Sequence, residues 1–336
     1  MKPDLLLRPA PGGLYCPIGD FYIDPVRPVE RALVTHGHSD HARSGHRSVL
    51  ATRQTLDIMA IRYGEDFCGS AQAVAFGEKT VVGGVTVSFH PAGHVLGSAQ
   101  IAVEKDGLRI VVSGDYKRRP DPTCAAYEPV PCDVFVTEAT FGLPVFHHPD
   151  PVDEMKKLYG SLRQFPERTH MIGAYALGKA QRVIRLLRDT GFDEPVYIHG
   201  AMEKLCSYYV QQGIDLGDLQ PATIVGRDKS QFRGAVVVGP SSAFAERWAR
   251  RFVEPLPAFA SGWMMVRQRA RQAGVELPLV ISDHCDWPEL IATITELQPQ
   301  EVWVTHGREE ALVRWCELAG IRAKPLHLVG YEDEGD

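Results

Sequence analysis

The sequence lacks several features that would assign it to whole classes of protein. Its seven cysteines are odd in number and form no C-x-x-C pair, which argues against a disulfide framework and against a thiolate zinc site. No stretch approaches the roughly 18 uninterrupted apolar residues that a membrane helix needs. The N-terminal segment MKPDLLLRPAPGG has too short an apolar run for a signal peptide. We therefore expect an uncleaved, cytoplasmic protein with reduced thiols and no membrane partner.

An excess of positive charge is also missing, because the formal net charge is −6 at pH 7. This speaks against a protein whose whole surface attracts nucleic acid, but it leaves room for a local basic groove. The composition is that of a globular chain with a proper core, at 44% hydrophobic and 23% charged residues. The length of 336 residues predicts about two domains, or one domain with a large insertion.

The pattern of expected elements changes along the chain. Up to about residue 115, short β-rich runs separated by Gly and Pro predict strands, with one helix at residues 52–64. Strands in such quick succession indicate hairpins and a sheet that is partly antiparallel. From about residue 150 helices and strands alternate, which is typical of a parallel sheet covered by helices. This later part includes a predicted helix at 242–252 and a predicted strand at 277–284.

The sharpest chemical signal is the segment THGHSDH at residues 35–41. Three imidazoles and a carboxylate within this segment suit borderline divalent metals such as zinc, or manganese where more oxygen ligands join. The strand RALVT leads into the segment, and Gly37 lets the backbone turn so that the side chains converge. We interpret His36 and His38 as ligands of one ion, with Asp40 and His41 addressing a second ion nearby.

Three further candidates follow apolar strands in the same manner. They are His94 between two glycines, Asp115 after VVSG, and His306 after EVWVT. Asp115 is a carboxylate that can bridge two cations. Asp24, at the end of FYID, is expected to orient the loop histidines as a hydrogen-bond acceptor and not to bind metal itself. Because candidate ligands lie on both sides of residues 145–280, an inserted second domain explains the change of pattern better than two domains in series.

These motifs resemble those of a known family. THGHSDH, AGHVLGS and SGD are similar, in order and spacing, to motifs of the metallo-β-lactamase superfamily, and Asp24 fits its first motif. Residues 137–142 (TEATFG) look like motif A of the β-CASP nucleases, residues 282–286 (SDHCD) like motif B, and His306 like motif C. The resemblance extends from about residue 14 to 328.

The resemblance implies a fold and a division of the chain. The fold would be α/β: an αββα metallo-β-lactamase sandwich with an inserted α/β β-CASP domain. Residues 1–145 would form the first part of the sandwich, 146–278 the inserted domain, and 279–336 the second part.

The resemblance also implies a pair of divalent metal ions, with zinc expected and manganese as the alternative. One ion would be held by His36, His38, His94 and Asp115, and the other by Asp40, His41, Asp115 and His306. Asp40 and Asp115 would fix a water for attack on a phosphodiester. His284 is the candidate general acid, oriented by Glu138.

Contacts to a nucleic-acid backbone require arginine and lysine. Lys117, Arg118 and Arg119 directly follow Asp115, and Lys179 begins a helix that also carries Arg182 and Arg185. For Arg182 and Arg185 a solvated helix face is an equal alternative. Trp263 could stack on a base, although a tryptophan in the core is the more common role.

The choice between DNA and RNA depends on details around the motifs. The segments GLYCP, IDP, GDYKRRPDPT and EATFGLP look like the bacterial ligase-associated DNA exonucleases. We therefore expect a DNA exonuclease, with 5′ to 3′ polarity, that acts in DNA repair alongside an ATP-dependent DNA ligase. A histidine at motif C resembles the RNA-processing enzymes, so a ribonuclease of the RNase J kind or an mRNA 3′-end endonuclease stays as the alternative. An inactive nucleic-acid-binding subunit is disfavoured because all seven ligand candidates are present.

Overall fold

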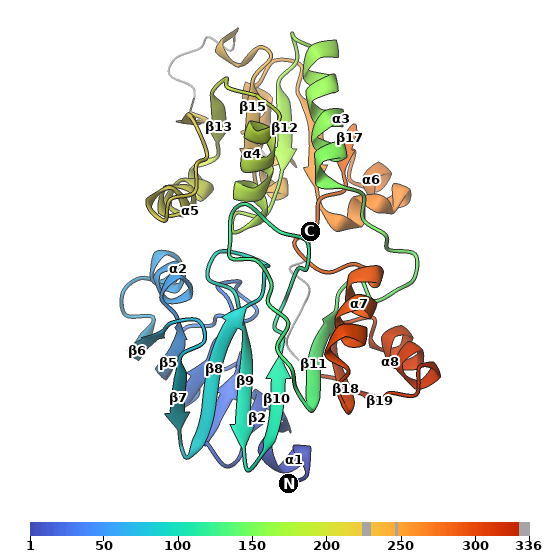
Figure 1. Cartoon of the computed structure of the whole chain (residues 1–336). Helices are drawn as coiled ribbons and strands as arrows, with labels where there is room; N and C mark the ends of the chain where they lie inside the picture. The colour runs from blue at the N-terminus through green and yellow to red at the C-terminus, as the bar shows by residue number, and fades with distance from the viewer. Residues whose placement is uncertain (224–229, 246–247, 329–336) are drawn as a thin grey trace. The chain divides into compact units, whose positions relative to one another are not determined.

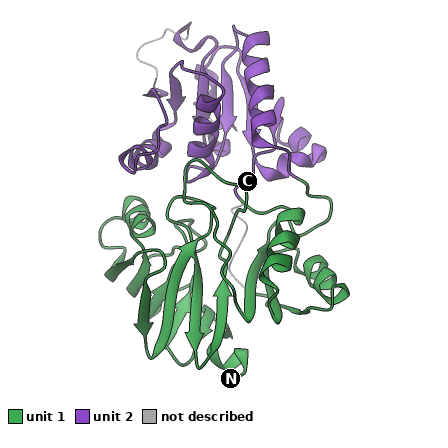
Figure 2. Ribbon diagram, viewed as in Figure 1, with its two compact units in different colours: residues 1–147, 284–335 green, residues 148–283, 336 purple. Residues whose placement is uncertain are grey.

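The computed structural model describes residues 1–223, 230–245 and 248–328 (Figure 1). The chain forms two compact units (Figure 2). Unit 1 comprises Met1–His147 and the chain from His284 onward, and unit 2 comprises His148–Asp283. The chain thus leaves unit 1 and returns to it after unit 2. The domain boundaries expected at 145 and 278 lie a few residues before those of unit 2.

Unit 1 contains two mixed sheets. In the first sheet β1 to β3 are antiparallel and β3 to β6 are parallel. In the second sheet β7 to β10 are antiparallel, and β10, β11, β18 and β19 are parallel. The predicted hairpins and the partly antiparallel character of the sheets are confirmed. In spatial order the strands of the first sheet are β1 (Arg8–Ala10), β2 (Gly13–Cys16), β3 (Phe21–Ile23), β4 (Arg31–Leu33), β5 (His46–Thr52) and β6 (Cys68–Val74). Those of the second are β19 (Arg322–Pro325), β18 (Glu301–Gly307), β11 (Val134–Ala139), β10 (Leu108–Val112), β9 (Ala99–Lys105), β8 (Val85–Pro91) and β7 (Lys79–Val82).

The two sheets of unit 1 pack face to face because side chains alternate across each strand. On β10, Ile110 and Val112 lie in the core that both sheets share, whereas Val111 lies in the core on the opposite face. Trp303 on β18 is fully buried in the shared core, where it meets apolar side chains of the first sheet such as Leu14. Burial of each large apolar side chain stabilises the fold by about 1.5–3 kcal/mol, so this shared core holds the sheets together.

Helices cover the outer faces of unit 1. The second sheet packs against α7 (Trp287–Leu297) and α8 (Glu309–Leu318) through residues such as Leu290 and Leu312. The first sheet packs against α2 (Arg53–Tyr63) through Leu56. A short helix, α1 (Pro3–Leu6), precedes β1. Unit 1 is therefore a helix–sheet–sheet–helix sandwich, compatible with the expected α/β fold.

Unit 2 is built around one parallel sheet. The central strands β12 and β15 are buried along their whole length, as expected for a parallel sheet covered on both faces. The predicted parallel α/β arrangement is confirmed. In spatial order the strands are β14 (Leu219–Pro221), β13 (Val196–Ile198), β15 (Val236–Gly239), β12 (His170–Gly173), β16 (Leu256–Ala260) and β17 (Leu277–Leu279). The α-helices are α3 (Pro151–Gln164), α4 (Lys179–Asp189), α5 (Gly200–Gln211) and α6 (Arg267–Gln272).

In the later part of the chain one predicted element is wrong and another is shorter than predicted. The helix expected at 242–252 is replaced by two 3-10 helices, η2 (Ser241–Ala245) and η3 (Ala249–Arg251), and residues 246–247 lie outside the described residues. The strand expected at 277–284 ends at Leu279. Beyond it the carbonyl of Ile281 accepts a hydrogen bond from the Lys179 ammonium at 3.1 Å, a bond that a side chain and not a neighbouring strand provides.

In the part of the chain that the structure describes, none of the helices has the length and apolar character needed to span a lipid bilayer.

Candidate metal centre

The candidate ligands follow strands of both sheets of unit 1. THGHSDH follows β4, the His94 loop follows β8, Asp115 follows β10, and His306 lies near the end of β18. Strands β8, β10 and β18 run in the same direction, because β8 and β10 are each antiparallel to β9 and the β10–β11–β18 pairs are parallel. Their carboxyl ends therefore lie at one edge of the second sheet, where the loops that carry the ligands meet.

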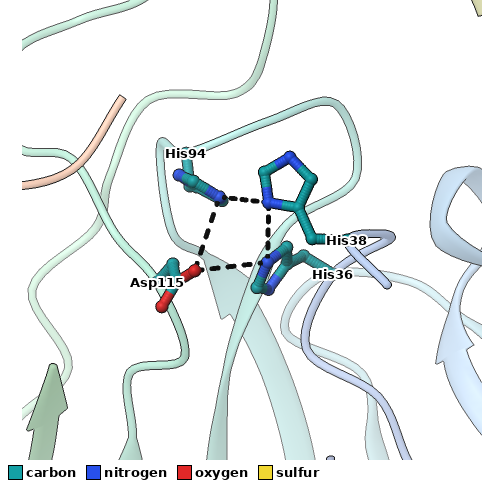
Figure 3. A group of neighbouring side chains, drawn as sticks. All are labelled: His36, His38, His94 and Asp115. Carbon is teal, nitrogen blue, oxygen red and sulfur yellow. Dashed lines mark hydrogen bonds and ion pairs between the residues drawn. The ribbon is translucent and has the colours of Figure 1, made fainter. Parts of the chain in front are cut away.

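Four of the predicted ligands converge on one point, as Figure 3 shows. The Nδ1 atom of His38 lies 3.1 Å from Nε2 of His36 and 3.0 Å from Nε2 of His94. The Oδ2 atom of Asp115 lies 3.4 Å from Nε2 of His36 and 3.8 Å from Nε2 of His94. All four residues are buried. The four ligand atoms lie within 4.8 Å of one another, so this group can hold a metal ion.

The donor set of this first group fits a divalent cation. Three imidazole nitrogens and one carboxylate oxygen match the ligands that zinc takes in tetrahedral sites. Hydrogen bonds alone stabilise such a cluster poorly. A single proton can be shared by only two of the nitrogens, and the lone pairs of the remaining ligand atoms would still repel one another. A cation in their midst would accept all of these lone pairs at once.

The remaining predicted ligands lie beside this group. Nε2 of His41 lies 3.4 Å from Oδ2 of Asp40 and 3.5 Å from Oδ2 of Asp115. The His306 ring stacks on the His41 ring with centroids 5.2 Å apart. Oδ1 of Asp40 is buried and has no hydrogen-bond partner among the described residues, as fits an oxygen that a cation would engage. Asp115 thus touches both groups of candidate ligands, as a bridging carboxylate would.

A β-bulge aims the His306 side chain. Along the β11–β18 pair, Glu138 is opposite Thr305 and Ala139 is opposite Gly307, so His306 is the extra residue. Its φ of 58° lies in the left-handed region that side chains other than glycine rarely adopt. Bulges of this kind redirect a side chain and are frequent next to functional sites.

Asp24 lies next to the candidate ligands, and its carboxylate contacts His41 and Thr35. Its Oδ2 lies 2.8 Å from Nδ1 of His41 and accepts a hydrogen bond from the Thr35 hydroxyl at 2.6 Å. Its Oδ1 accepts from the Thr35 backbone N–H at 2.8 Å. The Thr35 hydroxyl in turn lies 3.0 Å from Nδ1 of His36. These bonds orient both rings so that each Nε2 faces the centre, which is the acceptor role expected for Asp24.

Burial and neighbouring charges shift the protonation of the cluster. Burial, together with the neighbouring His41, lowers the pKa of His36 well below its usual range and that of His306 to about 3. Burial raises the pKa of Asp115 to about 7, although the charges of His41 and His284 oppose the shift. Burial opposes protonation of His41 too, but Asp40, Asp115 and Asp24 outweigh it and raise its pKa well above the usual value. Cation binding to this site therefore competes with protons.

The structure brings Glu138 and His284 together beside the first group. Nδ1 of His284 lies 2.9 Å from Oε2 and 3.1 Å from Oε1 of Glu138. Glu138 is fully buried, whereas the His284 side chain keeps 20% of its surface exposed. The His284 ring lies 4.7 Å, centroid to centroid, from the ring of His94. The pair has the geometry of an imidazole held by a carboxylate next to the ligand cluster.

The two lysines that were predicted to contact phosphate form ion pairs within the protein. Lys117 is buried and pairs with Glu289 at 2.5 Å. Lys179 is also buried, and within unit 2 it pairs with Asp283 at 2.5 Å. Both ammonium groups are thus neutralised by carboxylates within the protein, and the phosphate contacts of Lys117 and Lys179 stay predictions.

The neighbouring cations are paired as well. Arg118 forms an ion pair with Glu296 at 2.6 Å, and Arg119 forms one with Asp286 at 3.2 Å. Both arginines remain partly exposed, so these pairs leave a phosphate contact open to them. The half-buried Trp263 in unit 2 carries the Arg269 guanidinium over its ring at 4.0 Å.

Sequence reasoning missed several residues that support the site. The Thr140 hydroxyl donates to Oε2 of Glu138 at 2.5 Å, and the Tyr116 backbone N–H donates to Oε1 at 2.8 Å. Thr140 directly follows the last residue of β11, and its place two residues after a candidate carboxylate was the available signal, because residues two apart in an extended segment share a face. Gly114 is required for close approach: its φ is 56°, and a Cβ there would lie 2.8 Å from the Thr35 side chain. The close approach of Gly114 to Thr35 places the Asp115 loop against the THGHSDH segment.

Replacing Asp24 by asparagine is expected to weaken metal binding by about 10- to 100-fold, because the variant loses the charged acceptor that orients His41 and Thr35. Dissociation constants for zinc and manganese, measured by competition with a chromophoric chelator, would check this. Asp57 on α2 is a partly exposed aspartate that forms an ion pair with Arg53. It supplies the matched Asp→Asn control. An Asp24→Asn protein that binds metal as tightly as the Asp57→Asn protein would contradict the orienting role.

No protein-family model matches the chain. The chain is 27% identical to a "Probable DNA ligase" from Opitutus terrae, over 93% of this chain and 32% of that protein. It is 26% identical to the cleavage and polyadenylation specificity factor subunit 3 of Dictyostelium discoideum, over 77% of this chain and 40% of that protein. It is 24% identical to an RNase J-like protein from Methanocaldococcus jannaschii, over 54% of this chain and 50% of that protein. The chain thus spans between a third and a half of these relatives.

One solved structure shares the fold. A protein of unknown function from Enterococcus faecalis V583 matches with a TM-score of 0.56 at 12% identity, over 84% of this chain and 76% of that one. The likeness concerns the architecture alone. Taken together, the buried cluster that can hold a metal ion and the curated relatives are consistent with the metallo-β-lactamase and β-CASP nuclease family.

Proposed function

We propose that the chain is a metal-dependent nuclease that hydrolyses phosphodiester bonds with two divalent cations, zinc in the first instance. The observation that carries the proposal is the convergence of His36, His38, His94 and Asp115 within 4.8 Å, with the Glu138–His284 pair beside them. Relatives named as an endoribonuclease and as RNase J-like support the same chemistry. Cations at such a site supply Lewis acidity that lowers the pKa of a water and neutralises charge on the phosphoryl oxygens.

The residues of the chain would divide the work as follows. His36, His38 and His94 would hold one cation and Asp40, His41 and His306 the other, and Asp115 would contribute to both. Asp115 and Asp40 also accept hydrogen bonds from the attacking water and so direct it toward phosphorus.

The leaving oxygen requires a proton. Because Nδ1 of His284 contacts Glu138, its Nε2 is the nitrogen that would give a proton to that oxygen. The Glu138 carboxylate stabilises the positive imidazolium and keeps the ring from turning.

Within this function we infer a DNA exonuclease with 5′ to 3′ polarity that acts in repair alongside an ATP-dependent DNA ligase. The support is the match to the protein named "Probable DNA ligase", which extends over 93% of this chain. Unit 2, with its parallel sheet inserted between the two parts of unit 1, would be the β-CASP domain. The alternative is a ribonuclease, favoured by the endoribonuclease and RNase J-like relatives and by the histidine at position 306.

The test is a panel of 5′- and 3′-labelled strands, single and duplex, in matched DNA and RNA sequences, incubated with metal-stripped protein and with added zinc or manganese. We expect metal-dependent release of nucleotides from DNA, beginning at the 5′ end. A clear preference for RNA would overturn the DNA assignment and leave the nuclease. Absence of metal-dependent cleavage of every strand would overturn the nuclease itself.

A further inference from the structure

Lys117 is buried next to the proposed general acid. It lies two residues after Asp115 and exposes only 2% of its surface. Its Nζ donates hydrogen bonds to Oε2 of Glu289 at 2.5 Å and to the backbone carbonyl of His284 at 2.9 Å. A buried ammonium is unfavourable unless its donors are satisfied. The bond from Lys117 therefore restrains the position of the His284 carbonyl.

The backbone around Lys117 holds the same part of the site. The Tyr116 carbonyl accepts from the N–H of Cys285 at 2.8 Å, and the Tyr116 N–H donates to Glu138. The N–H of Lys117 donates to the Ala92 carbonyl at 3.0 Å, in the loop of His94. The stretch from Asp115 to Lys117 therefore contacts both partners of the Glu138–His284 pair and the loop of a candidate metal ligand.

Glu289 anchors this arrangement in α7. Its side chain accepts from the Arg119 N–H at 2.9 Å and from the Asp286 N–H at 3.2 Å, and Asp286 caps the helix in return. The Lys117 ammonium is thus held at the start of a helix that packs in the core of unit 1. Motion of the lysine away from His284 would require breaking a buried ion pair.

We propose that Lys117 is a positioning residue for the nuclease reaction: through the carbonyl of His284 it holds the imidazole on Glu138, so that Nε2 meets the leaving oxygen. This rests on the proposed function. In the step concerned, the oxygen of the attacking water bonds to phosphorus and releases one proton to solvent, the bond from phosphorus to the 3′ oxygen breaks, and the proton of Nε2 passes to that oxygen; the imidazole then regains a proton from solvent.

The alternative is that the Lys117–Glu289 pair only stabilises the fold. Changing the leaving group distinguishes this alternative from the proposed positioning role. A 3′ oxygen is a poor leaving group that needs the proton, whereas a bridging 3′ sulfur leaves as thiolate without one. Loss of proton delivery therefore slows cleavage of an oxygen linkage much more than that of a sulfur linkage. A general loss of folding or of metal slows both alike.

Four variants test the proposal on matched strands that carry oxygen or sulfur at the bridging 3′ positions next to both ends. Lys117→Met removes the tether and deprives the buried Glu289 carboxylate of its ammonium partner. Glu289→Gln keeps the Lys117 bond to His284, and the double variant removes the tether without leaving a buried charge. Ile294→Val, at a fully buried apolar side chain on α7, controls for a small loss of stability.

We expect Lys117→Met and the double variant to cleave the oxygen strand about 10- to 100-fold more slowly than wild type, and the sulfur strand within about 3-fold of it. Glu289→Gln should slow cleavage of the oxygen strand less than Lys117→Met does, because it keeps the Lys117 bond to His284, and Ile294→Val should keep both rates within about 3-fold of wild type. Urea unfolding and bound metal per chain are measured on every variant. Recovery of the oxygen-strand rate in the double variant, in step with its stability, would overturn the proposal, as would equal slowing of both strands. A wild-type protein that cleaves neither strand would instead contradict the proposed function.

Discussion

Replacing Asp115 by alanine should abolish nuclease activity, with a loss of roughly 1,000-fold or more in turnover. Its Oδ2 lies 3.4 Å from His36, 3.5 Å from His41 and 3.8 Å from His94, so one substitution removes a ligand atom from both candidate metal positions. The bridging negative charge also offsets the repulsion between two cations. Bound metal per chain, measured by mass spectrometry, should fall together with the rate on the labelled strand.

Asp121 provides the matched control for this prediction. It is a buried aspartate six residues further along the chain, and its Oδ1 accepts from the Thr123 N–H at 2.8 Å and from the Thr123 hydroxyl at 2.6 Å. Asp121→Ala should lose some stability but retain metal and activity. If Asp115→Ala keeps the metal content and the rate of Asp121→Ala, the two-cation mechanism is wrong.

The second large effect is expected at His284. Conversion to alanine should lower turnover of the natural linkage by about 100- to 10,000-fold, the range that general acid catalysis supplies. Bound metal should stay unchanged, because the side chain faces Glu138 and stands beside the cluster without being needed to complete the first ligand group. Glu138→Gln should lose less, since an amide oxygen still accepts from Nδ1 of His284 but no longer stabilises its positive charge.

Single-turnover rates at saturating substrate separate this role from binding. His327, whose side chain is 71% exposed, supplies the matched His→Ala control in the same unit. A His284→Ala protein with a normal single-turnover rate and a raised KM would show that the imidazole binds substrate and delivers no proton.

Much of the site was accessible from the sequence because its ligands are local features of strand ends. A strand followed by glycine and a histidine or aspartate predicts a side chain at the edge of a sheet, and this reasoning selected His36, His38, His94 and Asp115, which the structure brings within 4.8 Å. The Glu138–His284 pair was expected only through the family resemblance, since 146 residues separate its members.

Other features depend on contacts that no local pattern records. The bulge that aims His306 arises from the register between β11 and β18, and the register depends on how two distant strands pair. The prediction of Lys117 as a phosphate ligand considered its place next to Asp115 and not its partner 172 residues away, Glu289. The structure shows that Lys117 is buried, and a lysine inside the core requires a neutralising partner there.

The sequence by itself determined the chemical kinds of donor, the strands that deliver them and the interruption of one unit by another. These follow from residue type and from the periodicity of short segments, which act over a few residues. Only the tertiary structure decided which donors share a centre and how Asp24 orients two rings. It also decided which lysine and arginine side chains are neutralised by internal ion pairs. Those outcomes depend on distances of a few ångströms between residues far apart in the chain, because coordination, hydrogen bonding and charge pairing all fall off over that range.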